Sequence, residues 1–168
     1  MFASAEALPV LHAELSRHLS ALLLELSPEH LGLYWPIRSE FNAPAACLAD
    51  MRLAGTPFSL PFCVRSPIAL GYRAWNRQAP TVRDECGIAT GDGPAVEPDV
   101  VLVPCVGFTA SGYRLGYGGG YFDRWMAAHP HVAAVGVAWS VAEISEADLQ
   151  PQPHDQALSL VLTERGVV

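Results

Sequence analysis

The chain has 168 residues, 51% of them hydrophobic and 16% charged, so it can bury a substantial core and is not intrinsically disordered. Ten basic residues against seventeen acidic ones give a formal net charge of -7, which repels a polyanion and excludes nucleic acid as an expected partner. All ten basic residues are arginines, so any cationic side chain that contacts a phosphate must be a guanidinium.

The cysteines are irregularly spaced, which is typical neither of a zinc site nor of a small disulfide scaffold. We interpret all four as buried thiols of a reducing compartment: Cys47, Cys63, Cys86 and Cys105. The apolar stretch 19–26 is interrupted by Ser20 and Glu25 and has no basic leader. The sequence therefore predicts neither a signal peptide nor a membrane span, and we expect a cytoplasmic protein.

Hydrophobic periodicity predicts helices alternating with strands along the chain. The predicted elements are a helix at 11–26, a strand at 31–36, a helix at 43–53, strands at 59–64 and 69–75, a loop at 81–98, a strand at 100–104, a helix at 121–129, and strands at 132–139 and 159–163. The wholly apolar run 100–104 indicates a strand buried on both faces of a parallel sheet. Loops as long as 81–98 are often functional. Together these elements predict a single domain with a three-layer α/β/α, Rossmann-like architecture and a mostly parallel sheet.

Four glycines precede the predicted helix at 121: Gly116, Gly118, Gly119 and Gly120. A backbone without Cβ atoms can bend tightly and present successive amides to one anion, and a helix N-terminus adds unpaired amides and about half a positive charge. A strand, a glycine loop and a helix in this order predict a phosphate-binding loop at the carboxyl end of a sheet. A tight turn without a ligand is the alternative, and the run matches neither a Walker loop nor a dinucleotide fingerprint.

The amino-acid sequence of this loop is similar to the signature of the 5-formyltetrahydrofolate cyclo-ligase family. The similar stretches are Pro-Cys-Val-Gly-Phe at 104–108 and Gly-Tyr-Arg-Leu-Gly-Tyr-Gly-Gly-Gly-Tyr-Phe-Asp-Arg at 112–124. Three further segments follow the order of the family: 34–40, then Leu60-Pro61 with 72–75, then His154-Asp155 with 162–164. The resemblance spans about Leu11 to the C-terminus and implies the fold type shared by NagB, RpiA and the CoA transferases.

The family converts 5-formyltetrahydrofolate to 5,10-methenyltetrahydrofolate with ATP and Mg2+, releasing ADP and phosphate. The residues that the resemblance implies for ATP are Arg114, Leu115, Gly116, Tyr117, Gly118, Gly119, Gly120, Tyr121 and Phe122, with Arg114 and Tyr121 also assigned to catalysis. Those implied for the folate are Trp35, Glu40, Trp75, Tyr117, Tyr121 and Phe122. Asp123 and Asp155 are implied as Mg2+ ligands. The implied partners are these two substrates, and we expect a monomer or a weak homodimer.

Several of these residues also have plain structural interpretations. Asp123 can complement a helix dipole, Asp155 can be a solvated loop residue, and each aromatic side chain can belong to the core. Glu40 can form an exposed ion pair with Arg38 or Arg52.

The family usually opens with a basic helix that reaches the ATP phosphates, whereas the first basic residue here is Arg17. We expect either that the chain starts after this helix or that it is a natural variant. Smaller departures from the family pattern occur at Asn42-Ala43, at 88–90 and at Thr109. The leading hypothesis is an ATP-dependent cyclo-ligase, and the second is a non-catalytic folate- or nucleotide-binding relative with a degenerate ATP site. A sugar-phosphate isomerase-like protein ranks last because no catalytic acid can be placed in the phosphate pocket.

Overall fold

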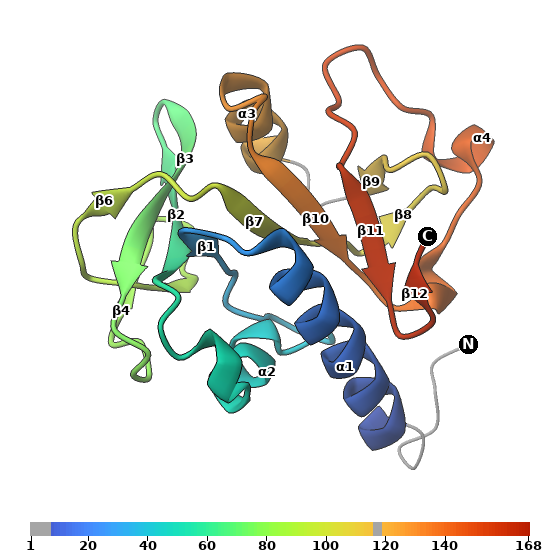
Figure 1. The fold of residues 1–168 in the computed structure, drawn as a ribbon. Helices are drawn as coiled ribbons and strands as arrows, with labels where there is room; N and C mark the ends of the chain where they lie inside the picture. The colour runs from blue at the N-terminus through green and yellow to red at the C-terminus, as the bar shows by residue number, and fades with distance from the viewer. Residues whose placement is uncertain (1–7, 116–118) are drawn as a thin grey trace.

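The computed structural model describes residues 8–115 and 119–168. An eight-stranded sheet forms its centre, in the order β12-β11-β10-β7-β1-β2-β3-β6 (Figure 1). The five neighbours from β11 to β2 run parallel, and antiparallel strands complete both ends. The strands are β1 (Leu31–Gly32), β2 (Phe58–Arg65), β3 (Ile68–Trp75), β6 (Ala95–Val96), β7 (Val100–Pro104), β10 (Ala133–Val137), β11 (Leu160–Thr163) and β12 (Gly166–Val167). The predicted α/β architecture with a mostly parallel sheet is confirmed.

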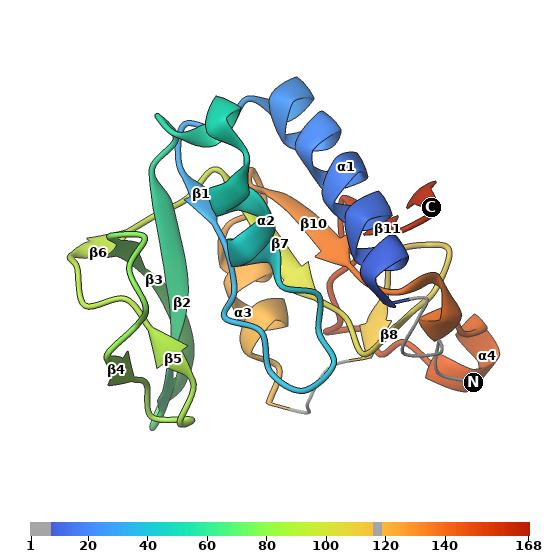
Figure 2. The same cartoon turned by 90° about the horizontal axis from the view of Figure 1, so that it is seen from below.

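Helices cover both faces of this sheet (Figure 2). The helices are α1 (Leu8–Leu26), α2 (Ala43–Ala49), α3 (Tyr121–Ala128) and α4 (Glu146–Leu149). Short 3-10 turns lie at Met51–Leu53 and Ser140–Ala142, and two small two-stranded sheets pair β4 (Val82–Arg83) with β5 (Ala89–Thr90) and β8 (Gly107–Phe108) with β9 (Arg114–Leu115). No helix in the described residues has the length and apolarity needed to cross a membrane.

Strand β7 explains the three layers, because its alternate side chains enter two separate cores. Val100 and Leu102 pack in the cluster that contains the buried side of α1 and α2, whereas Val101 and Val103 pack in the cluster that contains α3. All five residues of β7 are buried, as the apolar run predicted.

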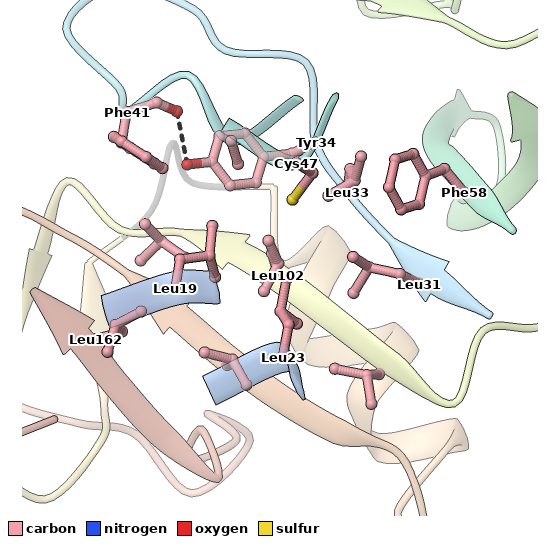
Figure 3. Packing of buried hydrophobic residues seen from close by; sticks show 14 of the residues in the cluster. Leu19, Leu23, Leu31, Leu33, Tyr34, Phe41, Cys47, Phe58, Leu102 and Leu162 are labelled. Atoms are coloured by element: carbon pink, nitrogen blue, oxygen red, sulfur yellow. Dashed lines mark hydrogen bonds between the residues drawn. The ribbon is translucent and has the colours of Figure 1, made fainter. Parts of the chain in front are cut away.

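The core beneath α1 also fixes the loop that leaves β1 (Figure 3). Leu19 and Leu23 of α1 pack with Leu102 and with the residues that follow β1. The Tyr34 hydroxyl donates to the carbonyl of Phe41 at 2.8 Å, and burial raises the pKa of Tyr34 well above its ordinary value. The 34–41 loop is thus anchored in the core at both ends.

Three predicted elements differ from the structure. The strand predicted at 31–36 keeps only Leu31–Gly32, because the chain leaves the sheet after the bond from the Leu33 amide to the Ser59 carbonyl and Pro36 has no amide hydrogen. The helix predicted at 43–53 ends at Ala49, since the Asp50 side chain accepts from the Arg52 amide and starts a 3-10 turn instead. The loop predicted at 81–98 contains β4, β5 and β6.

The interpretation of four buried thiols is wrong for two of them. Cys47 and Cys105 are buried, at 1% and 8% exposure. Cys63 and Cys86 are only half-buried, because Cys63 lies toward the end of β2 and Cys86 lies in the turn between β4 and β5.

Candidate functional site

The β8–β9 hairpin follows β7 and holds Arg114 at the carboxyl edge of the sheet. Arg114 pairs with the fully buried Phe108 across the hairpin, and one guanidinium nitrogen donates to the Pro104 carbonyl at 3.4 Å. The guanidinium carbon lies 5.1 Å from the centre of the Phe122 ring. Its Nε is buried and has no hydrogen-bond partner among the described residues. Arg114 is therefore held from two sides by described residues.

Helix α3 begins immediately after the glycine-rich loop. Gly120 is its N-cap, with φ of 68° in the left-handed region that glycine tolerates best, and no side chain caps the helix there. A Cβ at Gly119 would lie 2.3 Å from the Tyr121 ring, so glycine permits the close approach of that ring. Leu115 is 49% exposed, and Gly116, Tyr117 and Gly118 lie outside the described residues. The described end of the loop thus offers an uncapped helix N-terminus, which favours an anion.

The two predicted Mg2+ ligands come from segments that meet. Asp123, in the first turn of α3, accepts a hydrogen bond from the Gln156 amide through Oδ1 at 3.0 Å. Asp155 precedes Gln156 in the chain, and its Oδ2 accepts from the Gln152 amide at 2.7 Å. The structure therefore brings the 155–156 segment to the N-terminal turn of α3, although the described residues contain no group of three side chains that could hold a metal.

Glu40 and Arg114 approach the same buried thiol from opposite loops. Burial raises the pKa of Cys105 to about 11, with Arg114 acting to lower it and Glu40 acting to raise it. Glu40 is half-buried and accepts from the Ile37 amide at 2.9 Å. Arg52, one of the proposed alternatives for pairing with Glu40, is bound to Asp50 at 3.0 Å.

Trp35 and Trp75 pack edge to face, with ring centres 6.0 Å apart. Trp75 is only 7% exposed, and its indole nitrogen donates to the Gln78 carbonyl. Trp35 is half-buried at the exit of β1. Trp35 is therefore the member of the pair that a ligand can reach, whereas Trp75 mainly supports it from the core.

Tyr121 contacts a residue that the sequence did not single out. The Cys86 thiol donates to the Tyr121 hydroxyl at 3.4 Å, and this contact raises the pKa of Tyr121 to about 12. Asp84 fixes Cys86, because its Oδ1 accepts from the Cys86 amide at 2.9 Å and from the Ile88 amide at 3.0 Å. The only signal for these residues in the sequence is the unusual length of the 81–98 loop.

The surface has two shallow hollows outside the residues assigned to ATP and folate. One, of about 290 Å³, lies between β3, β6 and α3 and is lined by Tyr72, Trp125 and His129 among others. The other, of about 260 Å³, lies over β2 beside Cys63 and Asp84. Neither is lined by a residue predicted to bind ATP or folate, so the candidate site rests on the contacts around Arg114 and α3.

The fold and the described part of the site define an α/β protein in which an arginine and the uncapped N-terminus of α3 lie at the carboxyl edge of a mostly parallel sheet. A sequence profile of the 5-formyltetrahydrofolate cyclo-ligase family matches residues 74–164, which is just over half of the chain. The chain therefore belongs to this family. The matched stretch contains Arg114, α3 and Asp155, whereas Trp35 and Glu40 lie outside it.

Two relatives carry the name 5-formyltetrahydrofolate cyclo-ligase. The protein of Mycolicibacterium smegmatis is 40% identical over 75 residues, which cover 43% of this chain and 37% of the relative. The protein of Mycoplasma pneumoniae is 36% identical over 67 residues, which cover 39% of each chain. The similarity thus spans well under half of each relative.

Two solved structures are similar over nearly the whole chain. The 5,10-methenyltetrahydrofolate synthetase of Aquifex aeolicus has a TM-score of 0.76 and 27% identity, with 98% of this chain and 84% of that one covered. The synthetase of Mycoplasma pneumoniae has a TM-score of 0.75 and 21% identity, with 97% and 90% covered. This second likeness concerns the fold alone.

Proposed function

We propose that the protein converts 5-formyltetrahydrofolate to 5,10-methenyltetrahydrofolate with ATP and Mg2+, releasing ADP and phosphate. The observation that carries the proposal is the meeting of Arg114, the uncapped N-terminus of α3 and the 155–156 segment at one edge of the sheet, in a chain of this family. These groups offer positive charge and carboxylates where a parallel sheet binds ligands.

The chemical difficulty is that a formamide oxygen is a poor leaving group. Transfer of the γ-phosphoryl group of ATP to that oxygen gives an iminium-like phosphate and ADP. The neighbouring folate nitrogen then attacks the activated carbon and closes the ring, and phosphate leaves with the former formyl oxygen. The protein has to hold both substrates in line and balance the charge of the phosphates.

Arg114 and the backbone around Gly119 and Gly120 would hold the phosphates. The guanidinium is already oriented by the Pro104 carbonyl and the Phe122 ring, so little freedom is lost when an anion binds. The first amides of α3 supply the second group of donors. Tyr121, beside this turn, would contact the transferred group through its hydroxyl.

The residues present suit a Mg2+ ion that takes part of its coordination from phosphate and water. Asp123 and Asp155 would provide two carboxylates, each already oriented by a backbone amide. When bound, the ion neutralises phosphate charge during transfer. Two carboxylates agree with the lack of a larger ligand cluster among the described residues, because Mg2+ bound to nucleotides seldom has a full protein cage.

Glu40 and Trp35 would bind the folate from the loop after β1. A carboxylate can accept two parallel hydrogen bonds from the amino group and ring nitrogen of a pterin, and Trp35, on the same loop, offers an aromatic ring. Both lie on the loop that Tyr34 anchors in the core (Figure 3). Phe122, held against Arg114, would contact the aromatic part of the substrate near the phosphates.

The test is an assay of the purified chain with 5-formyltetrahydrofolate, Mg2+ and ATP, followed by the absorbance of the methenyl product. We expect product formation that needs all three additions and one ADP released for each product. The matched variant is Arg114→Lys, which keeps the positive charge but loses the planar guanidinium with its paired donors. We expect its KM for ATP to rise. A folded protein that binds ATP and folate without turnover would instead support the non-catalytic relative, and binding of neither ligand would refute both.

A further inference from the structure

A pair of thiols lies beside Tyr121, outside the groups assigned to the substrates. One carboxylate holds the backbone of both cysteines: Asp84 Oδ2 accepts from the Cys63 amide at 3.0 Å, and Oδ1 accepts from the Cys86 amide at 2.9 Å. The Glu85 amide also donates to the Cys63 carbonyl at 3.3 Å. These bonds hold both cysteine backbones against one carboxyl group, and a disulfide between them requires Cα atoms about 4.4–6.8 Å apart.

The side chain of Cys86 also lies near that of Cys63. Burial, the neighbouring Asp84 and the Cys86 thiol together raise the pKa of Cys63. Both thiols are half-buried rather than sealed in the core. Because the pair joins β2 to the turn between β4 and β5, a covalent bond between them needs no rearrangement of the central sheet.

Cys86 is the member of the pair that contacts α3. Its thiol donates to the Tyr121 hydroxyl at 3.4 Å, and Tyr121 is the first residue of α3. The guanidinium of Arg65 also lies beside Cys86, and their contact raises the pKa of Arg65. Cys86 is half-buried, so a small oxidant can reach its sulfur.

We propose that Cys63 and Cys86 form an oxidant-sensitive dithiol, and that its disulfide withdraws Cys86 from Tyr121 and weakens nucleotide binding. The oxidant is a peroxide. Cys86 loses its proton and its sulfur attacks one peroxide oxygen; the O–O bond breaks, and the departing hydroxide takes up that proton to give water and a sulfenic acid. The Cys63 sulfur then attacks the Cys86 sulfur, the S–S bond forms, the S–O bond breaks, and a second water leaves with the Cys63 proton. The two thiols lose two electrons and one hydrogen peroxide becomes two waters.

The expected weakening of ATP binding rests on the proposed function, whereas the formation of the Cys63–Cys86 disulfide does not. A sulfur bonded to Cys63 has no hydrogen to donate to Tyr121. Loss of one neutral hydrogen bond corresponds to about two- to tenfold in affinity. We expect this loss in the binding of ATP, because Tyr121 directly follows Gly120.

The sequence allows each cysteine to be followed on its own peptide. Cleavage after arginine and before aspartate gives 39–49 with Cys47, 53–65 with Cys63, 84–91 with Cys86 and 99–114 with Cys105. The intact chain is treated with hydrogen peroxide, alkylated, digested and analysed by mass spectrometry. We expect 53–65 joined to 84–91, while Cys47 and Cys105 become alkylated only after denaturation. A different pairing, or Cys86 oxidised without a crosslink, overturns the dithiol.

Calorimetry with ATP and Mg2+ tests the consequence on the same preparations. Oxidised protein should bind about two- to tenfold more weakly, and dithiothreitol should restore the affinity. Cys63→Ser, which cannot form the crosslink, should show no loss after the same treatment. Formation of the crosslink with unchanged affinity overturns the regulatory half of the proposal. If the reduced protein does not bind ATP, the proposed function fails, and peptide mapping still decides whether the dithiol exists.

Discussion

Replacing Gly119 by alanine perturbs the site at one defined point. The new Cβ would lie 2.3 Å and 2.5 Å from two carbons of the Tyr121 ring, where real contacts exceed 3 Å. The Gly119 backbone is outside the left-handed region, so alanine is tolerated there and the ring has to move. A displaced rotamer costs about 0.5–1.5 kcal/mol, and a misplacement of about 1 Å can lower a catalytic rate about 100-fold. We therefore expect a large loss of activity with a small loss of stability.

The measurement combines initial rates of methenyl formation at varied ATP with thermal unfolding. For Gly119→Ala we expect kcat/KM for ATP to fall about 10- to 100-fold, and the Tm to fall by about 2–6 °C. Gly55→Ala is the matched control, because no atom lies within 4 Å of its new Cβ, and neither quantity should change. A folded Gly119→Ala protein with unchanged kcat/KM would refute the role given to the Tyr121 ring at this turn.

Three further outcomes follow from other contacts. Asp123→Asn should lower turnover about 10- to 100-fold. The fold should be kept, because the oxygen of the new side-chain amide can still accept from the Gln156 backbone amide. Unchanged rates at varied Mg2+ would remove Asp123 from the metal site. Leu102→Ala, at a fully buried position, should lower the free energy of unfolding by about 2–5 kcal/mol in urea, whereas Val106→Ala, 47% exposed, should have little effect. Burial raises the pKa of Asp99, but hydrogen bonds from backbone amides outweigh burial, so the net shift of this pKa is downward. The ionised Asp99 carboxylate should therefore stabilise the fold above about pH 4, and this stabilisation should be lost at lower pH. The difference in unfolding free energy between the parent protein and Asp99→Asn should vanish on acidification.

The parts of the fold that local patterns specify were predictable from the sequence. Strand β7 follows from five consecutive apolar residues, and α1 follows from leucines at helical spacing. Composition also marked the glycine-rich segment before α3, although a tight turn without a ligand has the same composition. The roles of Arg114 and Asp155 could not come from pattern alone, and they entered through resemblance to a family.

Contacts between distant segments could not be predicted in this way. The Asp84 carboxylate binds the amide of Cys63, and no periodicity in either segment signals this bond. Trp75 shows the same limit, because a tryptophan near a ligand and a tryptophan in a core have the same local sequence pattern. Its 7% exposure results from packing against Phe58 and Trp35, which only the assembled sheet determines.

The strand order explains why the two halves of the candidate site meet. From β1 the chain continues outward through β2 and β3 on one side, and it later returns to pair β7 with the other side of β1. The loops that leave β1 and β7 therefore diverge to opposite faces, and the space between them is where open parallel sheets bind ligands. Glu40 belongs to the first loop and Arg114 to the second, and both act on Cys105. The loops that carry Glu40 and Arg114 therefore leave adjacent strands through the pairing of Leu31 with Val100, which neither segment specifies alone.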